Sequence, residues 1–279
     1  MRPIVYPLLI FTLFSGCSSV HIESSPSSVA QPERAQISTD LKRTIRVLAS
    51  DIGERNLYHP EQLERAASLI TSELQSRGYP EAHRIPVLFD PSRFQVAGNP
   101  RAFNIQAELK GTSADLIVIG AHYDSKVAMP GWHDHWPPTP NRPGTPGAND
   151  NASGIAALLY LAGALRQLSP TATIRFVAFV NEEPPFFQTS AMGSLSYAEA
   201  LYANGEQNVR MISSETLGCF SSRKRKKRVG IVSLFGLDDS SSYIAFLGNM
   251  HSRPWMEHAA TAFSARIGHR PFAGGPCTL

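Results

Sequence analysis

Two kinds of hydrophobic pattern alternate along the chain between residues 39 and 214. From about residue 39, and again over residues 60–76, apolar side chains recur three and four positions apart, as they do on the buried face of a helix. Gly53 is placed to end the first of these helices, and Gly78 follows the second. The pattern therefore predicts two amphipathic helices at the start of the globular part of the chain.

Shorter apolar runs predict the strands of a sheet. They lie near residues 85–89, 103–109, 116–121, 173–180 and 209–214, and helical patterns near 155–168 and 195–204 separate the later ones. The run 116–121 is apolar throughout, which is typical of a strand covered on both faces, and 209–214 is expected to be a third core strand. Strands that alternate with helices predict an α/β fold, a three-layer αβα sandwich around a mostly parallel mixed sheet.

The composition favours a folded domain and argues against a nucleic-acid partner. With 279 residues, 42% of them hydrophobic, the chain can bury one core of ordinary size, or at most two small ones. The net charge is +3, but without the six consecutive basic residues at 223–228 it would be −3. The positive charge is therefore local, we interpret the basic run as a solvated loop, and no nucleic-acid binding is expected.

The first residues have the pattern of an export signal. A basic residue precedes a short apolar stretch at 4–14, and two small residues stand before Cys17. This resembles the bacterial lipobox, whose cysteine is lipidated after cleavage. We therefore predict a lipoprotein signal peptide over 1–16, and a flexible tether over 17–38 whose Cys17 is anchored in a lipid bilayer. The expected location is the bacterial cell envelope, at the outer membrane where there are two membranes; an ordinary signal peptide and a buried apolar start are the alternatives.

Acidic residues and one histidine follow the predicted strands at the points where they end. They are His122 and Asp124 after 116–121, Glu182 and Glu183 after 173–180, Glu215 after 209–214, and Asp150 before the helix 155–168. Ligands of such sheets bind at the carboxyl ends of the strands. Carboxylates crowded there repel one another and lose hydration, and a divalent cation offsets both costs. The three cysteines have no CxxC spacing, so a metal would be held by histidine and carboxylates.

These side chains suggest distinct roles. The metal-ligand candidates, which form a set that suits zinc, are His122, Asp150, Glu183 and Glu215. Asp124 comes two residues after His122, so the two share a face of the strand and Asp124 can orient the imidazole. Glu182 stands next to Glu183 and need not bind metal, which leaves it free to act as the general base.

Three segments carry a family resemblance: Gly120–Ser125, Gly147–Gly154 and Asn181–Pro185. In this order and on these elements they resemble the co-catalytic zinc aminopeptidases of metallopeptidase clan MH, whose relatives include glutamate carboxypeptidase and glutaminyl cyclase. The resemblance implies a zinc-exopeptidase-like catalytic domain over 39–279 that acts on peptide substrates and removes their N-terminal residues.

The resemblance also implies an arrangement of two zinc ions. His122 and Glu215 would hold one ion and Glu183 the other, while Asp150 would bridge them. Glu182 would be the general base, and Asp124 would support His122. This family closes its site with one further histidine near the C-terminus.

That final histidine has no clear counterpart in the sequence. His251, His258 and His269 lack the expected neighbours, so the C-terminal part is expected to be truncated or altered, and one zinc site to be weak or absent. A shift in the reading frame near the basic run is one hypothesis. The histidine-containing insert Trp132–Trp136 is interpreted as a surface loop, with replacement ligands or a pocket wall as alternatives.

Two other functions remain open on the sequence. One is a glutaminyl cyclase-like transferase, which would use a similar set of carboxylates with one zinc ion. The other is a catalytically impaired envelope protein that retains the fold, as the unassigned histidine would allow. The retention of both His122 and Glu215 favours the hydrolase.

Overall fold

A computed structural model describes residues 31–128, 143–206, 208–218, 244–267 and 272–273. Several predicted features lie outside these residues: the signal peptide, Cys17, the tether as far as residue 30, the insert Trp132–Trp136, the basic run 223–228 and His269. Within the predicted domain 39–279, the chain divides after Cys219, and Ala30–Cys219 forms one compact unit. Among the described residues, no helix combines the length and the apolar composition needed to cross a bilayer.

A five-stranded mixed sheet is the centre of the unit Ala30–Cys219. Its strands are β1 (His83–Val87), β2 (Ala102–Leu109), β3 (Leu116–His122), β4 (Thr173–Phe179) and β5 (Val209–Ser213), in the order β1-β2-β4-β3-β5. β3 runs parallel to both β4 and β5, whereas β2 runs antiparallel to β1 and β4. The α/β fold is therefore confirmed, with parallel pairing confined to the half of the sheet that contains β3.

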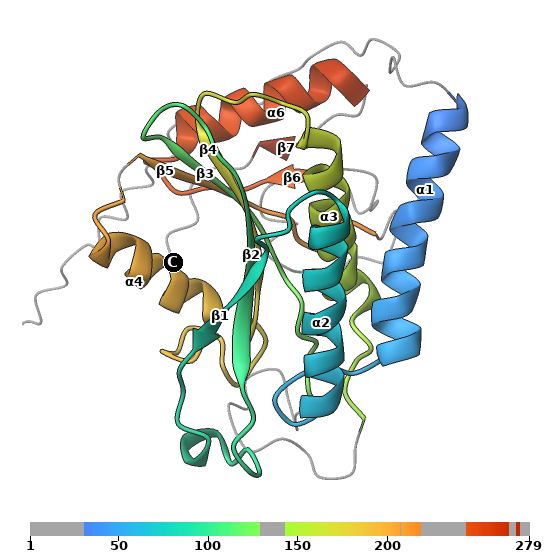
Figure 1. The fold of residues 1–279 in the computed structure, drawn as a ribbon, viewed down its shortest axis with the longest axis vertical. Helices are drawn as coiled ribbons and strands as arrows, with labels where there is room; N and C mark the ends of the chain where they lie inside the picture. Colours follow the sequence, from blue (N-terminus) through green and yellow to red (C-terminus); the bar gives the residue numbers. More distant parts are fainter. Residues whose placement is uncertain (1–30, 129–142, 207, 219–243, 268–271, 274–279) are drawn as a thin grey trace, which may run out of the picture. The chain divides into compact units, whose positions relative to one another are not determined.

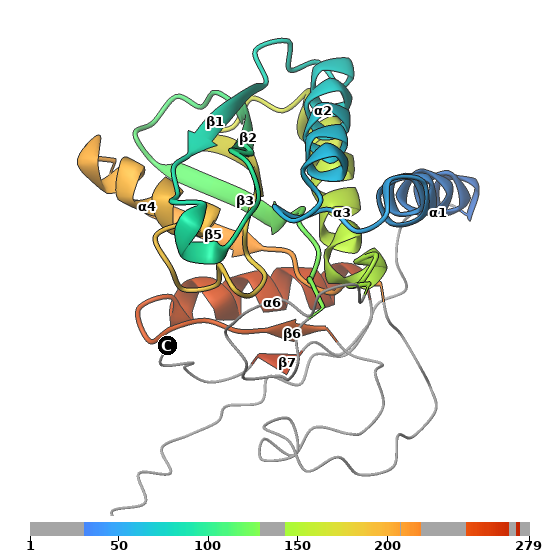
Figure 2. The same ribbon diagram turned by 90° about the horizontal axis from the view of Figure 1, so that it is seen from below.

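Helices cover both faces of this sheet. They are α1 (Gln31–Arg46), the π-helical segment η1 (Val47–Ile52), α2 (Pro60–Ser76), α3 (Ser153–Leu165) and α4 (Gly193–Ala203). Figures 1 and 2 show α2 and α3 on one side of the sheet and α4 on the other, while α1 packs against α3. The first helix ends before Gly53 as predicted, but it begins at Gln31, so residues 31–38 of the predicted tether are helical.

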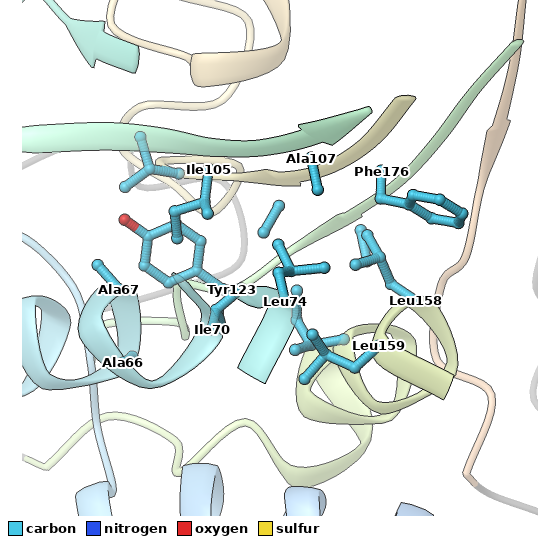
Figure 3. Close-up of a cluster of buried hydrophobic side chains, with 14 of the residues drawn as sticks. Ala66, Ala67, Ile70, Leu74, Ile105, Ala107, Tyr123, Leu158, Leu159 and Phe176 are labelled. Atoms are coloured by element: carbon cyan, nitrogen blue, oxygen red, sulfur yellow. The ribbon is translucent and has the colours of Figure 1, made fainter. Parts of the chain in front are cut away.

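The side chains of β4 alternate between two apolar clusters, one on each face of the sheet. Phe176 belongs to the larger cluster, which also holds the inward faces of α2 and α3, and Figure 3 shows it with Leu74 and Leu158. Val177, the next residue, belongs to the smaller cluster with Tyr197 of α4. Burial on both faces explains why β3 is apolar up to His122 and why β4 is apolar apart from Thr173 and Arg175.

The prediction of a third core strand at 209–214 is wrong in one respect. β5 is present and pairs with β3, but all five of its residues are exposed, and Met211 keeps 44% of its surface accessible. β5 stands last in the strand order and pairs only with β3 among the described strands. An apolar sequence pattern does not distinguish such a strand from a central one.

Beyond Cys219, the structure describes only residues 244–267 and 272–273. These residues form β6 (Ala245–Phe246), which pairs in parallel with β7 (Phe272–Ala273), and the helix α6 (Arg253–Ile267). The rings of Phe246 and Phe263 meet edge to face. Two of the candidate final histidines lie among these residues and are exposed: His251 before α6, and His258 within it.

Candidate metal centre

Strand direction brings the predicted site residues to one edge of the sheet. Because β3, β4 and β5 are mutually parallel, their carboxyl ends lie on the same side. His122 is the last residue of β3, and Glu182 and Glu215 follow closely after β4 and β5. Asp150 comes from the short segment η3 (Ala148–Ala152), where its backbone is not helical, immediately before α3.

The imidazole of His122 is the centre of the cluster. Its Nε2 lies 3.0 Å from Oδ1 of Asp150, 3.4 Å from Oε2 of Glu215 and 3.7 Å from Oε2 of Glu182. His122 is buried, while the three carboxylates remain partly open to solvent. Among the described residues, the ligand atoms of His122, Asp150 and Glu215 form a group within 4.8 Å of one another that can hold a metal ion.

The pKa values show how strongly these groups are crowded. Burial lowers the pKa of His122, but the surrounding carboxylates outweigh it and hold that pKa well above its ordinary range. The hydrogen bond with His122 lowers the pKa of Asp150. Burial raises the pKa of Glu182 to about 7, with help from the neighbouring carboxylates and against the opposing charge of His122. Burial and then the charge of Asp150 raise the pKa of Glu183 to about 8. One imidazole with several carboxylates is a donor set that fits zinc, whose charge would relieve this repulsion.

Asp124 connects the end of β3 to the loop after β4. Its Oδ1 accepts a hydrogen bond from the backbone N–H of Glu182 (3.1 Å), and its Oδ2 accepts one from the backbone N–H of Glu183 (3.0 Å). Oδ1 also lies 3.3 Å from Nδ1 of His122, an ion-pair contact, and that buried nitrogen has no hydrogen-bond partner among the described residues. Asp124 therefore faces His122 as predicted, and it also orients the paired glutamates.

Replacing Asp124 by alanine should weaken zinc binding by about 10–100-fold, the usual effect of losing a group that supports metal ligands. The Glu182–Glu183 backbone and the His122 ring would lose their common partner. Competition with a chromogenic chelator measures the affinity. Asp90→Ala, which removes an exposed carboxylate that bonds Ser92, is the control. Unchanged zinc affinity in Asp124→Ala would show that Asp124 does not support the metal ligands.

Glu183 occupies a different position from the other predicted ligands. It is buried, but it is not part of the three-residue group. Within the described residues, its carboxylate has no hydrogen-bond or ion-pair partner, although the charge of Asp150 is the second cause of its raised pKa. The structure thus brings together His122, Asp150 and Glu215, with Glu182 beside them, and leaves Glu183 close but separate.

Asn151 holds the loop that carries Glu215, a role that the sequence did not suggest. This fully buried amide donates to Oε2 of Glu215 and to the carbonyl of Ser214, both at 2.9 Å. Its Oδ1 accepts the N–H groups of Gly154 and Thr216. Asn151 stands in the Gly147–Gly154 segment, but only the tertiary contacts show what its side chain does.

One family model and several known proteins are similar to this chain. Residues 104–230 match the family model of Peptidase family M28. The chain is 28% identical over 253 residues to the uncharacterized protein YfbL of Escherichia coli (strain K12), covering 90% of this chain and 72% of that one. It is also 33% identical over 87 residues to Aminopeptidase YwaD of Bacillus subtilis (strain 168), which is 31% of this chain and 14% of that one.

Solved structures share the fold at low sequence identity. A Zn-dependent exopeptidase from Parabacteroides distasonis superposes with a TM-score of 0.57 at 18% identity, over 88% of this chain and 77% of the other. An Acidobacteriales bacterium glutaminyl cyclase gives 0.58 at 16% identity, over 94% and 77%. The segment that matches Peptidase family M28 contains His122, Asp150 and Glu182–Glu183. This match is consistent with the co-catalytic zinc aminopeptidase family that the sequence resembles.

Proposed function

We propose that this chain is a zinc-dependent aminopeptidase-like hydrolase that removes N-terminal residues from peptides. The observation that carries the proposal is the group of His122, Asp150 and Glu215, with the carboxylate of Glu182 3.7 Å from the same imidazole nitrogen. A ligand group with an uncommitted carboxylate beside it is what metal-assisted hydrolysis requires. The family match and the aminopeptidase relatives support the same reaction.

The residues of the site divide into ligands and a base. His122, Asp150 and Glu215 would hold a zinc ion, which when bound polarises a carbonyl group and makes water more acidic. Glu182 takes a proton from the attacking water and returns it to the leaving amine. Its pKa of about 7, raised by burial, suits a group that must both accept and release a proton near neutral pH.

A second zinc ion is part of the proposal. Asp150 would bridge the two ions, and Glu183 would bind the second one. The carboxylate of Glu183 supports this assignment, because burial and then the negative charge of Asp150 raise its pKa, and a nearby cation would offset both effects. The second ion needs one more ligand. The candidates are His251, His258 and His269, whose sequence neighbours differ from those of the family's final histidine.

Glutaminyl cyclase activity is the second candidate, since glutaminyl cyclases are among the structures that share the fold. Two substrates separate the reactions. Release of p-nitroaniline from a series of amino-acid p-nitroanilides indicates an aminopeptidase. Release of ammonia from a peptide with N-terminal glutamine, without cleavage of the chain, indicates a cyclase. If zinc-loaded protein releases neither p-nitroaniline nor ammonia, the result favours the third hypothesis, a protein that retains the fold but has lost catalysis.

We also propose that Cys17 anchors the protein in the bacterial envelope through an attached lipid. The apolar stretch 4–14 and the small residues before Cys17 support this. The full chain should incorporate radiolabelled palmitate and partition into detergent, whereas Cys17→Ser should do neither. Cys219→Ser is the matched control and should behave as the wild type does. A Cys17→Ser protein that is still labelled would contradict the assignment.

A further inference from the structure

Arg55 is a fully buried arginine whose side chain donates hydrogen bonds only to backbone carbonyls among the described residues. It lies between η1 and α2, and none of its surface is exposed. Nε bonds the carbonyl of Tyr123 at 2.6 Å, and Nη2 bonds that of Gly147 at 3.0 Å. Nη1 lies within 3.2 Å of three more carbonyls, those of Leu48, Gly53 and Pro146. One guanidinium thus joins three separate segments of the chain.

Two of these segments carry the candidate metal ligands. The carbonyl of Tyr123 lies between His122 and Asp124, and the carbonyl of Gly147 lies three residues before Asp150. The carbonyl of Gly147 also accepts the N–H of Ala152, so Arg55 bonds directly to the turn that presents Asp150. The two loops joined by Arg55 are the ones that bring His122 Nε2 and Asp150 Oδ1 to 3.0 Å.

The residues beside Arg55 strengthen the same connection. Its backbone N–H donates to Oγ of Ser125, and its carbonyl accepts the N–H of Ser125. Asn56 donates to the carbonyl of Ser125, while Glu54 accepts the N–H of Gly144 at 2.7 Å. The segment Glu54–Asn56 is therefore bonded to both ligand-bearing loops through backbone and side chain.

The charge of Arg55 also acts on the site. Burial lowers its pKa to about 10, and the negative charges of Asp124 and Asp150 oppose that shift. A guanidinium at this pKa stays protonated at neutral pH, so Arg55 carries a positive charge that interacts with the carboxylates of Asp124 and Asp150. Burying a cation is costly unless its N–H groups are satisfied, and five carbonyls satisfy this one.

We propose that Arg55 is a positioning residue for the candidate metal centre: its guanidinium fixes the loops of Tyr123 and Gly147 against each other and thereby sets the spacing of His122 and Asp150. The inference rests on the proposed function only in taking those two residues as metal ligands. Lysine cannot replace it, because an ammonium presents its donors from one point whereas the planar guanidinium reaches separate carbonyls on several sides. The metal affinity should therefore depend on arginine at this position.

The test measures Zn²⁺ affinity by chelator competition, and the visible spectrum of the Co²⁺-loaded protein, in Arg55→Lys and Arg55→Met. We expect both variants to bind Zn²⁺ about 10–100-fold more weakly and to give an altered Co²⁺ spectrum. Arg175→Lys is the control. Arg175 lies on β4, partly buried, and is paired with Glu108 and Glu206, so its loss should lower the melting temperature without changing either metal readout.

Several outcomes would overturn the inference. One is an Arg55→Lys protein with a lowered melting temperature but wild-type Zn²⁺ affinity and Co²⁺ spectrum, since that is a structural role alone. If neither Arg55 variant folds, Ser125→Ala replaces them, because it keeps Arg55 and the ligands but removes the hydroxyl that accepts the Arg55 N–H. Unchanged affinity there overturns the inference, as does a wild-type chain that binds no Zn²⁺. Wild-type protein that binds Zn²⁺ but does not cleave peptides contradicts the proposed function alone.

Discussion

Replacing Glu182 by glutamine should lower turnover about 10²–10⁴-fold, the usual contribution of a general base, and should leave the bound metal in place. Glutamine has nearly the same shape but cannot accept the proton of the attacking water. Glu182 Oε2 lies 3.7 Å from His122 Nε2, farther than the nearest oxygens of Asp150 and Glu215. The geometry therefore places Glu182 beside the ligand group and not within it.

Turnover on amino-acid p-nitroanilides and zinc content by elemental analysis are measured on the same preparation of Glu182→Gln. The matched control is Glu199→Gln, which changes an exposed glutamate on α4 and should leave both quantities as in the wild type. A wild-type rate in Glu182→Gln would make the assignment of the base wrong. Loss of zinc would instead identify Glu182 as a ligand.

Asp150→Asn should cost the protein most of its bound zinc. Asp150 is held in its ionised form, because the hydrogen bond with His122 lowers its pKa. An amide carries no charge and is a far weaker ligand for zinc, which prefers thiolate, imidazole and carboxylate. If Asp150 bridges two ions, the substitution removes a shared ligand from both, and the loss should exceed that caused by changing any ligand of one ion.

Elemental analysis gives the number of zinc ions per chain in the wild type and in Asp150→Asn. The control is Asp115→Asn, since Asp115 directly precedes β3 and so lies at the opposite end of that strand from His122. Normal zinc content in Asp150→Asn would exclude Asp150 as a ligand. If Asp150→Asn loses one zinc ion of two, Asp150 is a ligand of one ion and does not bridge both.

Regular elements of this chain could be predicted because their signals are local. The bounds of α2 agree with the predicted 60–76, where the helical period is clear, a proline occupies its first turn and a glycine follows it. β3 was evident from a continuous apolar run that burial on two faces explains, and β4 from a mostly apolar run that contains Arg175. The antiparallel placement of β2 between β1 and β4 was not evident, because side-chain alternation does not specify the direction of a partner strand.

The sequence by itself indicated which side chains gather at the candidate metal centre, although Glu183, one of the predicted ligands, lies outside the group of His122, Asp150 and Glu215. His122, Glu182 and Glu215 stand at or just after the ends of parallel strands, which share one edge of the sheet, and Asp150 directly precedes a predictable helix. Only the tertiary structure decided how they are held. Arg55 and Asn151 act through backbone groups far away in the sequence, within loops that have no period. A buried polar side chain must find partners wherever the fold supplies them, so its role is set by contacts that no local pattern records.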